Sequence, residues 1–438
     1  MFNHRGVHLQ IQVKKKGNKT CWKRKGSFFT LPFILISIFI LVACQPSQTE
    51  YACTDTLGCI TVLPDQPIKI GVIQALNSGG GVTQSQAIQV AAEHKNNKLL
   101  GHPIELVIEN SQCTPEGGTL AALKIIADLE IVGVLGTTCS GSAERSIPII
   151  SKNGLVMISG LNTAPSLTET QNTFGENWHQ GYFRTIFNGA HMAHAAASFA
   201  YIELGHLQAA TIDDGDVYSH ELAREFQAKF TELGGEITFS GVINKGDTNM
   251  APILDAVMTS GADVVYFPVF IEEASAIVLQ AREFSELESM DLIGGETLSS
   301  NVYLERIGEE GVGMYLTKAF LPPNPIKIEA SATYENMFGT LPAHHSFPSG
   351  YDAAKLLLDA IEATSIQADD GTIYVQKSAL RLYLYNVKNI NGASGTLTCT
   401  EFGDCGDSNV VIVQLRNPSL GISDLDNHIV YHYNLSDK

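Results

Sequence analysis

The sequence predicts an α/β protein with two doubly wound lobes, each built on a parallel sheet. Short apolar runs typical of buried strands alternate with amphipathic helical segments, first before residue 188 and again after it. About 395 residues follow the N-terminal 43, which is too many for one compact core and suits two lobes.

Strands of the first lobe are expected where apolar, β-branched residues run continuously, at residues 68–73, 104–108, 131–135 and 155–158. Helices are expected where apolar positions recur every three or four residues, at residues 85–96 and 119–129 and from the turn at 137–142 to Ile150. Residues 76–81 are rich in glycine and are expected to form a flexible turn. This turn lacks both the Gly-Lys-Ser/Thr of a phosphate-binding loop and the Gly-x-Gly-x-x-Gly fingerprint.

The second lobe repeats the pattern. Its strands are expected at residues 208–212, 236–242, 263–267 and 292–293, and its helices at 191–205, 219–233, 250–260 and 272–284. The chain then returns to the first lobe with a helix at 349–363, and residues 394–415 are expected to form a closing hairpin. The first lobe is therefore assigned residues 68–188 and 319–395, and the second 189–318 and 396–438.

The N-terminus is expected to be a secretory signal rather than part of the fold. Residues 1–43 hold eight Lys and Arg and no Asp or Glu, and an apolar run occupies 28–42. The ending Leu-Val-Ala-Cys matches a bacterial lipobox, which predicts cleavage before Cys44 and a diacylglycerol on its sulfur. An uncleaved anchor is the alternative. Either way the globular part is tethered to the membrane outside the cytoplasm, through a polar tether at 44–67.

The charge balance argues against partners that are themselves strongly negative. The whole chain carries −18, and loss of the basic leader makes the mature chain about −26. Nucleic acids and anionic membrane surfaces need basic patches, so neither is expected as a partner.

Two polar turns are the strongest candidates for a ligand site. Thr137–Ser142 follows the third strand, and Ser159–Thr163 follows the fourth. Parallel α/β sheets bind ligands at the carboxyl ends of their strands. The first turn also opens a helix, whose free N–H groups and dipole favour an anion. Together the turns are suited to a small carboxylate.

These turns resemble those of the branched-chain amino-acid binding proteins of bacterial ABC importers. In that family a Cys-Ser-Ser turn and a Ser-x-x-x-Thr-Ala-Pro turn hold the α-carboxylate and part of the ammonium group; Cys139-Ser140 and Ser159–Pro165 stand at those places. The resemblance covers roughly residues 68–415, and residues 263–282 also align to the family without gaps. It implies the type I periplasmic binding protein fold, with a three-strand hinge, and a monomer that delivers a small amino acid to an ABC permease without a cofactor.

The resemblance also implies the roles of individual residues. Ser140, Thr163 and the backbone of Leu161 would bind the carboxylate beside Cys139. Glu296 would take the ammonium, although it is also compatible with a solvated turn. Tyr218 and Phe270 would close from the second lobe. Phe270 stands where relatives have a tyrosine, so one hydrogen bond is lost, and the shortened glycine turn puts another contact in doubt.

Six cysteines remain after the signal and Cys44, an even number that suits an oxidising compartment. The family has a disulfide at the place of Cys113 and Cys139, which we expect at the ends of adjacent strands. The other two pairs, Cys53 with Cys59 and Cys399 with Cys405, each enclose a short loop and pair most simply within it. A zinc site is the alternative, but Cys-x5-Cys is not its usual spacing.

The sequence gives little support for an enzyme or for a metal site. There is no Gly-x-Ser-x-Gly elbow, and His191 and His194 lack the Glu of a zinc protease. His344-His345 lies among prolines and is expected to be a surface turn. The acidic residues at 401–407 lack calcium-loop spacing. The remaining alternatives are a ligand sensor of the same fold, a binder of an amide, urea or organic acid, and, last, a hydrolase.

Overall fold

In the computed structural model, which describes residues 51–407 and 409–433, the first lobe is built on a six-stranded sheet. All neighbouring strands are parallel except the short first one. Their order is β3 (Lys98–Leu99), β4 (His102–Asn110), β2 (Ile68–Gln74), β5 (Ile131–Gly136), β6 (Met157–Ser159) and β9 (Tyr182–Arg184). The central strands β2 and β5 are buried almost throughout, as expected for strands covered by helices on both faces.

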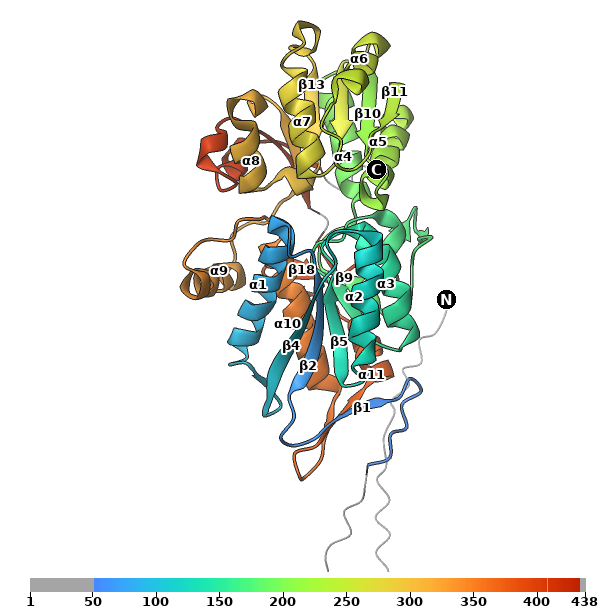
Figure 1. Cartoon of the computed structure of the whole chain (residues 1–438), viewed down its shortest axis with the longest axis vertical. Helices are drawn as coiled ribbons and strands as arrows, with labels where there is room; N and C mark the ends of the chain where they lie inside the picture. The colour runs from blue at the N-terminus through green and yellow to red at the C-terminus, as the bar shows by residue number, and fades with distance from the viewer. Residues whose placement is uncertain (1–50, 408, 434–438) are drawn as a thin grey trace, which may run out of the picture. The chain divides into compact units, whose positions relative to one another are not determined.

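Helices cover both faces of this sheet, so it is doubly wound as predicted (Figure 1). Helices α1 (Gly79–His94) and α10 (Phe347–Thr364) pack together, as do α2 (Pro115–Ala127) and α3 (Ser140–Lys152). Two further helices of this lobe are α9 (Pro325–Phe338) and α11 (Lys377–Tyr385). Two short hairpins complete it: β7 (Glu169–Thr170) with β8 (Thr173–Phe174), and β17 (Ile390–Asn391) with β18 (Thr396–Leu397).

The second lobe has a seven-stranded sheet that is parallel in its first five strands and antiparallel in its last two. The order is β11 (Glu236–Val242), β10 (Gln208–Asp213), β12 (Val264–Phe267), β13 (Asp291–Gly294), β14 (Tyr315–Ala319), β19 (Val410–Gln414) and β20 (Ile429–Tyr433). Alternate residues face opposite sides of the sheet. Val264 and Tyr266 join one hydrophobic cluster, whereas Val265 and Phe267 join another, so both faces are packed.

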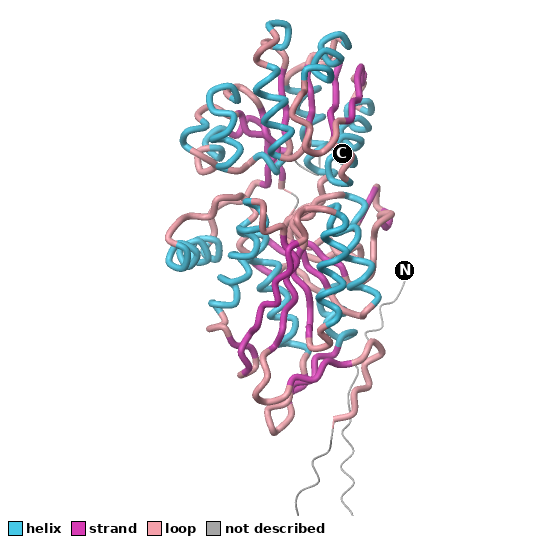
Figure 2. Tube along the Cα trace, viewed as in Figure 1, coloured by secondary structure: helices cyan, strands magenta, loops and turns pink. Residues whose placement is uncertain are grey.

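Helices of the second lobe are drawn in cyan in Figure 2; the first four lie close to their predicted positions, whereas the last, α8, was not predicted. They are α4 (Ala190–Ser198), continued by a π-helical turn at Phe199–Glu203, then α5 (Val217–Glu232), α6 (Ala251–Ser260), α7 (Ile271–Ala281) and α8 (Asn301–Ile307). Pattern-based boundaries were therefore accurate to a few residues. Among the described residues, no helix is both long and apolar enough to cross a membrane.

The chain crosses between the two sheets three times: after β9, after β14 and between Cys405 and β19. The third crossing comes later than the expected residue 395. Strand β18 pairs with β17, and the Cys405 N–H donates to the Arg184 carbonyl, so residues 396–405 belong with the first lobe. The predicted closing hairpin is also wrong, because β19 pairs with β14 and β20 rather than with residues 394–405.

Part of the expected tether is folded. Strand β1 (Cys59–Val62) pairs with β16 (Ile373–Gln376), which also pairs with β15 (Ile366–Gln367). The Asp55 carboxylate accepts hydrogen bonds from the N–H groups of Ser378 and Ala379 at the start of α11. A tether can therefore extend no further than residue 50. The signal sequence and Cys44 lie outside the described residues.

Three disulfides join the pairs expected from the sequence: Cys53–Cys59, Cys113–Cys139 and Cys399–Cys405. The reasoning for the second was wrong in one respect, because β4 and β5 are not neighbours: β2 lies between them. Cys113 and Cys139 instead lie just before α2 and α3, which pack against each other. The bridge therefore joins the beginnings of two helices.

Candidate functional site

A cavity of about 80 Å³ opens where the carboxyl ends of the two sheets meet. Six of the seven residues assigned to the ligand line it: Cys139, Ser140, Leu161, Tyr218, Phe270 and Glu296. The seventh, Thr163, lies immediately behind, because its hydroxyl donates to Glu296 Oε1 at 3.1 Å. The residues come from five separate turns of both lobes, so the fold brings together what the sequence spreads over some 160 positions.

The turn before α3 presents an anion-binding geometry. Helix α3 begins at Ser140, and its N-cap Cys139 makes no side-chain capping bond. The first N–H groups of a helix lack partners within that helix and attract negative charge. Both residues line the cavity.

The second turn is held in shape by its own serine. Ser159 Oγ accepts hydrogen bonds from the N–H groups of Leu161, at 3.0 Å, and Asn162, at 2.9 Å. The Leu161 N–H is therefore already bonded within the turn, and the expected backbone contact with a carboxylate stays a prediction. The Leu161 side chain lies close to Gly80, and both residues line the cavity.

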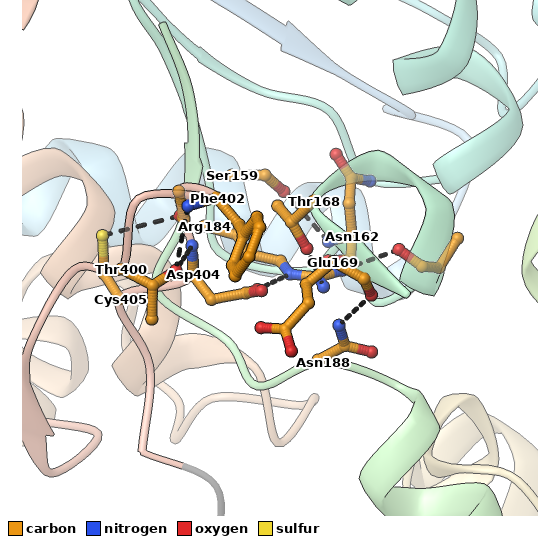
Figure 3. A network of polar contacts seen from close by, with 12 residues as sticks. Ser159, Asn162, Thr168, Glu169, Arg184, Asn188, Thr400, Phe402, Asp404 and Cys405 are labelled. Carbon is orange, nitrogen blue, oxygen red and sulfur yellow. Dashed lines mark hydrogen bonds and ion pairs between the residues drawn. The ribbon is translucent and has the colours of Figure 1, made fainter. Parts of the chain in front are cut away.

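A buried arginine positions this second turn (Figure 3). Arg184 is fully buried on β9 and donates from Nη1 to the carbonyl of Ala164 at 2.8 Å. Its Nε forms an ion pair with Asp404, inside the Cys399–Cys405 loop, and Nη2 bonds to Thr168. Planar, multidentate donation is the property that distinguishes arginine from lysine. Phe183-Arg184-Thr185 was noted only as a resembling segment, and nothing in the sequence indicated this role.

Glu296 is the central charged group of the cavity. It follows β13 and is 1% exposed. Tyr218 donates its phenol hydroxyl to Glu296 Oε2 at 2.8 Å, opposite the bond from Thr163. Burial raises the pKa of Glu296 to about 7, although these hydroxyl donors and a backbone N–H oppose the increase. The alternative of a solvated turn carboxylate is therefore excluded.

Two aromatic rings of the second lobe line the cavity, and a lysine lies against one of them. Tyr218 stands at the start of α5, where the Asp216 side chain accepts a hydrogen bond from the Tyr218 N–H. The ring centroids of Tyr218 and Phe270 are 5.5 Å apart. Lys245 Nζ lies 4.3 Å from the Phe270 centroid, within the range of a cation–π interaction, and donates to the carbonyl of Cys113 at 3.1 Å. Sequence reasoning did not identify Lys245.

Two expectations near the cavity are wrong. His344 is 5% exposed and lines the cavity, so it is not part of a surface turn. Burial lowers the pKa of His344 to about 4, which keeps it neutral at pH 7. The glycine run is not a flexible turn, because Ser78 accepts a hydrogen bond from the Gly81 N–H and begins α1 at Gly79. Ser78, Gly79 and Gly80 also line the cavity.

Metal ligation is not indicated in the part of the chain that the structure describes, because no cluster of three or more His, Cys, Asp or Glu there has a geometry that would hold an ion. The chemistry of the cavity is instead that of a binding site. It combines a helix N-terminus, a buried carboxylate and aromatic walls.

Comparison with known proteins agrees with this geometry. Residues 67–417 match the family described as periplasmic binding protein. The Leu/Ile/Val-binding protein homolog 3 of Brucella melitensis is 26% identical over 343 residues, which cover 77% of this chain and 88% of the relative. The Leu/Ile/Val-binding protein of Escherichia coli K12 is 25% identical over 349 residues, with the same coverage of 77% and 88%.

Solved structures give the same result. A leucine-binding protein from Thermotoga maritima superimposes with a TM-score of 0.73 at 26% identity, covering 85% of this chain and all of that one. A solute-binding protein of an ABC transporter from R. palustris, in complex with benzoate, shares the fold with a TM-score of 0.68 at 19% identity, covering 80% and 93%. The chain therefore belongs to the periplasmic binding protein family.

Proposed function

We propose that this protein captures a small amino acid, branched-chain or related, between its two lobes outside the cytoplasm and delivers it to the permease of an ABC importer. The observation that carries the proposal is Glu296, a buried carboxylate whose hydrogen-bond donors are all uncharged. A buried charge is stable only when it is paired, and a ligand ammonium supplies the missing partner.

The other side of the cavity suits the other end of a zwitterion. Ser140 and the first turn of α3 favour a carboxylate, while Glu296 favours an ammonium. An α-amino acid carries both charges on neighbouring atoms. The side chain would lie against Leu161, Tyr218 and Phe270, which are largely apolar. The names of the relatives, which bind Leu, Ile and Val, agree with such a ligand.

Placement at the membrane is part of the proposal. The lipobox at residues 41–44 supports lipidation of Cys44, and the three disulfides suit an oxidising compartment. The protein would act as a monomer, because one chain supplies both sides of the cavity. Transfer to the permease would follow closure of the lobes around the three crossings.

The test is calorimetric titration of the protein with leucine, isoleucine, valine and smaller amino acids. Glu296→Gln keeps the shape of the side chain but removes its charge, so amino-acid affinity should fall at least tenfold. The exposed Glu288 provides the control, since Glu288→Gln makes the same charge change away from the cavity. Unchanged binding in Glu296→Gln, or binding only of neutral amides or organic acids, would contradict the proposed ligand.

A further inference from the structure

His344 carries a hydrogen-bond donor that the protein itself does not use. The residue is 5% exposed and lines the amino-acid cavity. Its Nδ1 atom accepts a hydrogen bond from the Ser346 N–H at 3.2 Å. A backbone N–H can only donate, so Nδ1 carries no proton, and the proton of the neutral ring lies on Nε2. Among the described residues, this Nε2–H has no acceptor.

The Nε2 atom of His344 faces the amino-acid cavity. A Cβ atom built on Gly80 would lie 3.5 Å from Nε2 and 3.1 Å from Leu161 Cδ2. Gly80 and Leu161 line this cavity and not the neighbouring one that His344 also borders. Because glycine has no Cβ, a space remains beside Nε2. Nε2 is not one of the unpartnered polar atoms that are sealed from solvent, so a ligand in the cavity can reach it.

The beginning of helix α1 adds further donors at the same place. The Ser78 side chain accepts a hydrogen bond from the Gly81 N–H. The N–H groups of Gly79 and Gly80 have no acceptor within the helix, and both residues line the cavity. The helix dipole also favours an electron-rich group at this end. The His344 Nε2–H and the first turn of α1 are therefore both suited to an oxygen atom of the ligand.

This oxygen belongs to the side chain of the ligand and is uncharged. The α-carboxylate is assigned to Ser140 and the first turn of α3, on another turn of the cavity. Glu296 is the one charged side chain among the residues that line the cavity, and the ligand ammonium would balance it. A second carboxylate on the ligand would be buried without a cation, so a neutral oxygen fits this place better.

We propose that His344 and the first turn of α1 select an amino acid whose side chain carries a hydroxyl or carbonyl oxygen. The Nε2–H would donate to that oxygen, and the carbon atoms of the side chain would lie against Leu161, Tyr218 and Phe270. A side chain made only of hydrocarbon would leave the buried donor without an acceptor, which weakens binding. This specificity rests on the proposed function and narrows its ligand.

The experiment is calorimetric titration of the full-length chain in lipid nanodiscs with two pairs of amino acids of nearly equal size. Threonine has a hydroxyl where valine has a methyl group, and asparagine has an amide where leucine has a branched hydrocarbon. The oxygen-bearing member of at least one pair should bind about fivefold more tightly. Aspartate should bind more weakly than asparagine, because its side-chain carboxylate finds no cation in the cavity.

His344→Asn tests the Nε2 donor separately from the rest of the ring. The asparagine Oδ1 can still accept the Ser346 N–H, as Nδ1 does, but the shorter side chain places no donor at the position of Nε2. Any space that it opens is offered to both members of a pair, so the ratio of their affinities is the quantity to compare. That ratio should fall about fivefold in His344→Asn. It should stay unchanged in His432→Asn, the same substitution at an exposed residue outside the cavity.

The possible results separate this inference from the proposed function. Equal or weaker binding of the oxygen-bearing member in both pairs would overturn the inference and leave amino-acid capture intact. Tighter binding of aspartate than of asparagine, or an unchanged ratio in a folded His344→Asn variant, would also overturn it. Failure of every amino acid to bind would overturn both. The ratios in the unsubstituted protein decide the question even if His344→Asn does not fold.

Discussion

Glu296 shows how one residue links ligand capture to proton binding. In the protein without ligand its pKa is about 7, because burial disfavours the charged form and the neighbouring hydroxyls compensate only in part. An ammonium beside the carboxylate would lower that pKa. Binding would therefore release a proton at pH values between that lowered pKa and about 7.

Amino-acid affinity should consequently depend on pH. Above about pH 8 Glu296 is already charged, and affinity should be constant. As the pH falls below 7, affinity should decrease by up to about tenfold per pH unit, because protonation competes with the ammonium. Titrations between pH 5 and 9 in buffers of different ionisation enthalpy measure both the affinity and the released proton. The same pH dependence in Glu296→Gln would assign it to another group.

The same residue should limit the stability of the protein without ligand. The folded pKa of Glu296 is raised from 4.5 to about 7, so its stabilising contribution is complete below pH 4.5 and is lost as the pH rises through 7. At pH 8 the charged form costs the folded state about 3 kcal/mol. Glu296→Gln should therefore raise the free energy of unfolding by about 2–3 kcal/mol at pH 8 and change it little at pH 4.5. Urea denaturation at both pH values measures this, with Glu288→Gln as the control.

At the residue scale, the sequence predicted the groups that carry recognisable turn motifs. Cys139, Ser140 and Glu296 come within four residues of the end of a strand, and each lines the cavity. Lys245 and His344 were missed because each lies outside such a motif; only tertiary packing brings His344 to the cavity and Lys245 to the ring of Phe270. Sequence alone also does not show that Ser159 accepts a hydrogen bond from the Leu161 N–H within the turn.

At the element scale, the prediction worked where local pattern determines structure. Strand β11 was placed at its observed bounds, and most helix ends were within a few residues. The end of the chain was predicted less well: a strand was expected at 409–415 and β19 is there, but its pairing was wrong, because pairing partners are set by tertiary structure and β19 joins β14 across nearly a hundred residues of chain. Helix α1 begins at Gly79, before the predicted residue 85, because the N-cap Ser78 outweighs the low helix propensity of three glycines.

The segment that Arg184 organises yields a prediction at this scale. Its fully buried guanidinium bonds at once to the second ligand turn and to the Cys399–Cys405 loop. Arg184→Lys keeps the charge but loses the planar set of donors, so the free energy of unfolding should fall by about 2–4 kcal/mol, with weaker amino-acid binding. Arg306 also pairs with a carboxylate, but at the surface, so Arg306→Lys should change stability by less than about 1 kcal/mol. Chemical denaturation of the two variants makes the comparison, and equal losses would contradict the positioning role.

At the scale of the whole molecule, the contacts that close the cavity are few and specific. Thr163 and Glu296 belong to different lobes, and so do Cys113 and Lys245. The Asp216 carboxylate of the second lobe lies so close to Gly141 of α3 that a Cβ at Gly141 would be 2.8 Å from its Oδ2. A ligand in the cavity would therefore be enclosed by polar contacts between the lobes at its rim.

Lys245 is the rim contact that should control how long the ligand stays. Its Nζ reaches the Cys113 carbonyl of the first lobe while lying over Phe270, which lines the cavity. The bond to Cys113 exists only when the lobes are together, so Lys245→Met should accelerate amino-acid dissociation about tenfold and leave the association rate nearly unchanged. Lys388 offers a matched control, because its Nζ also donates to a disulfide-bonded cysteine carbonyl, that of Cys399, but within the first lobe. Stopped-flow measurement of both rates for Lys245→Met and Lys388→Met distinguishes a contact between lobes from a general loss of charge, since equal acceleration in the two variants would contradict it.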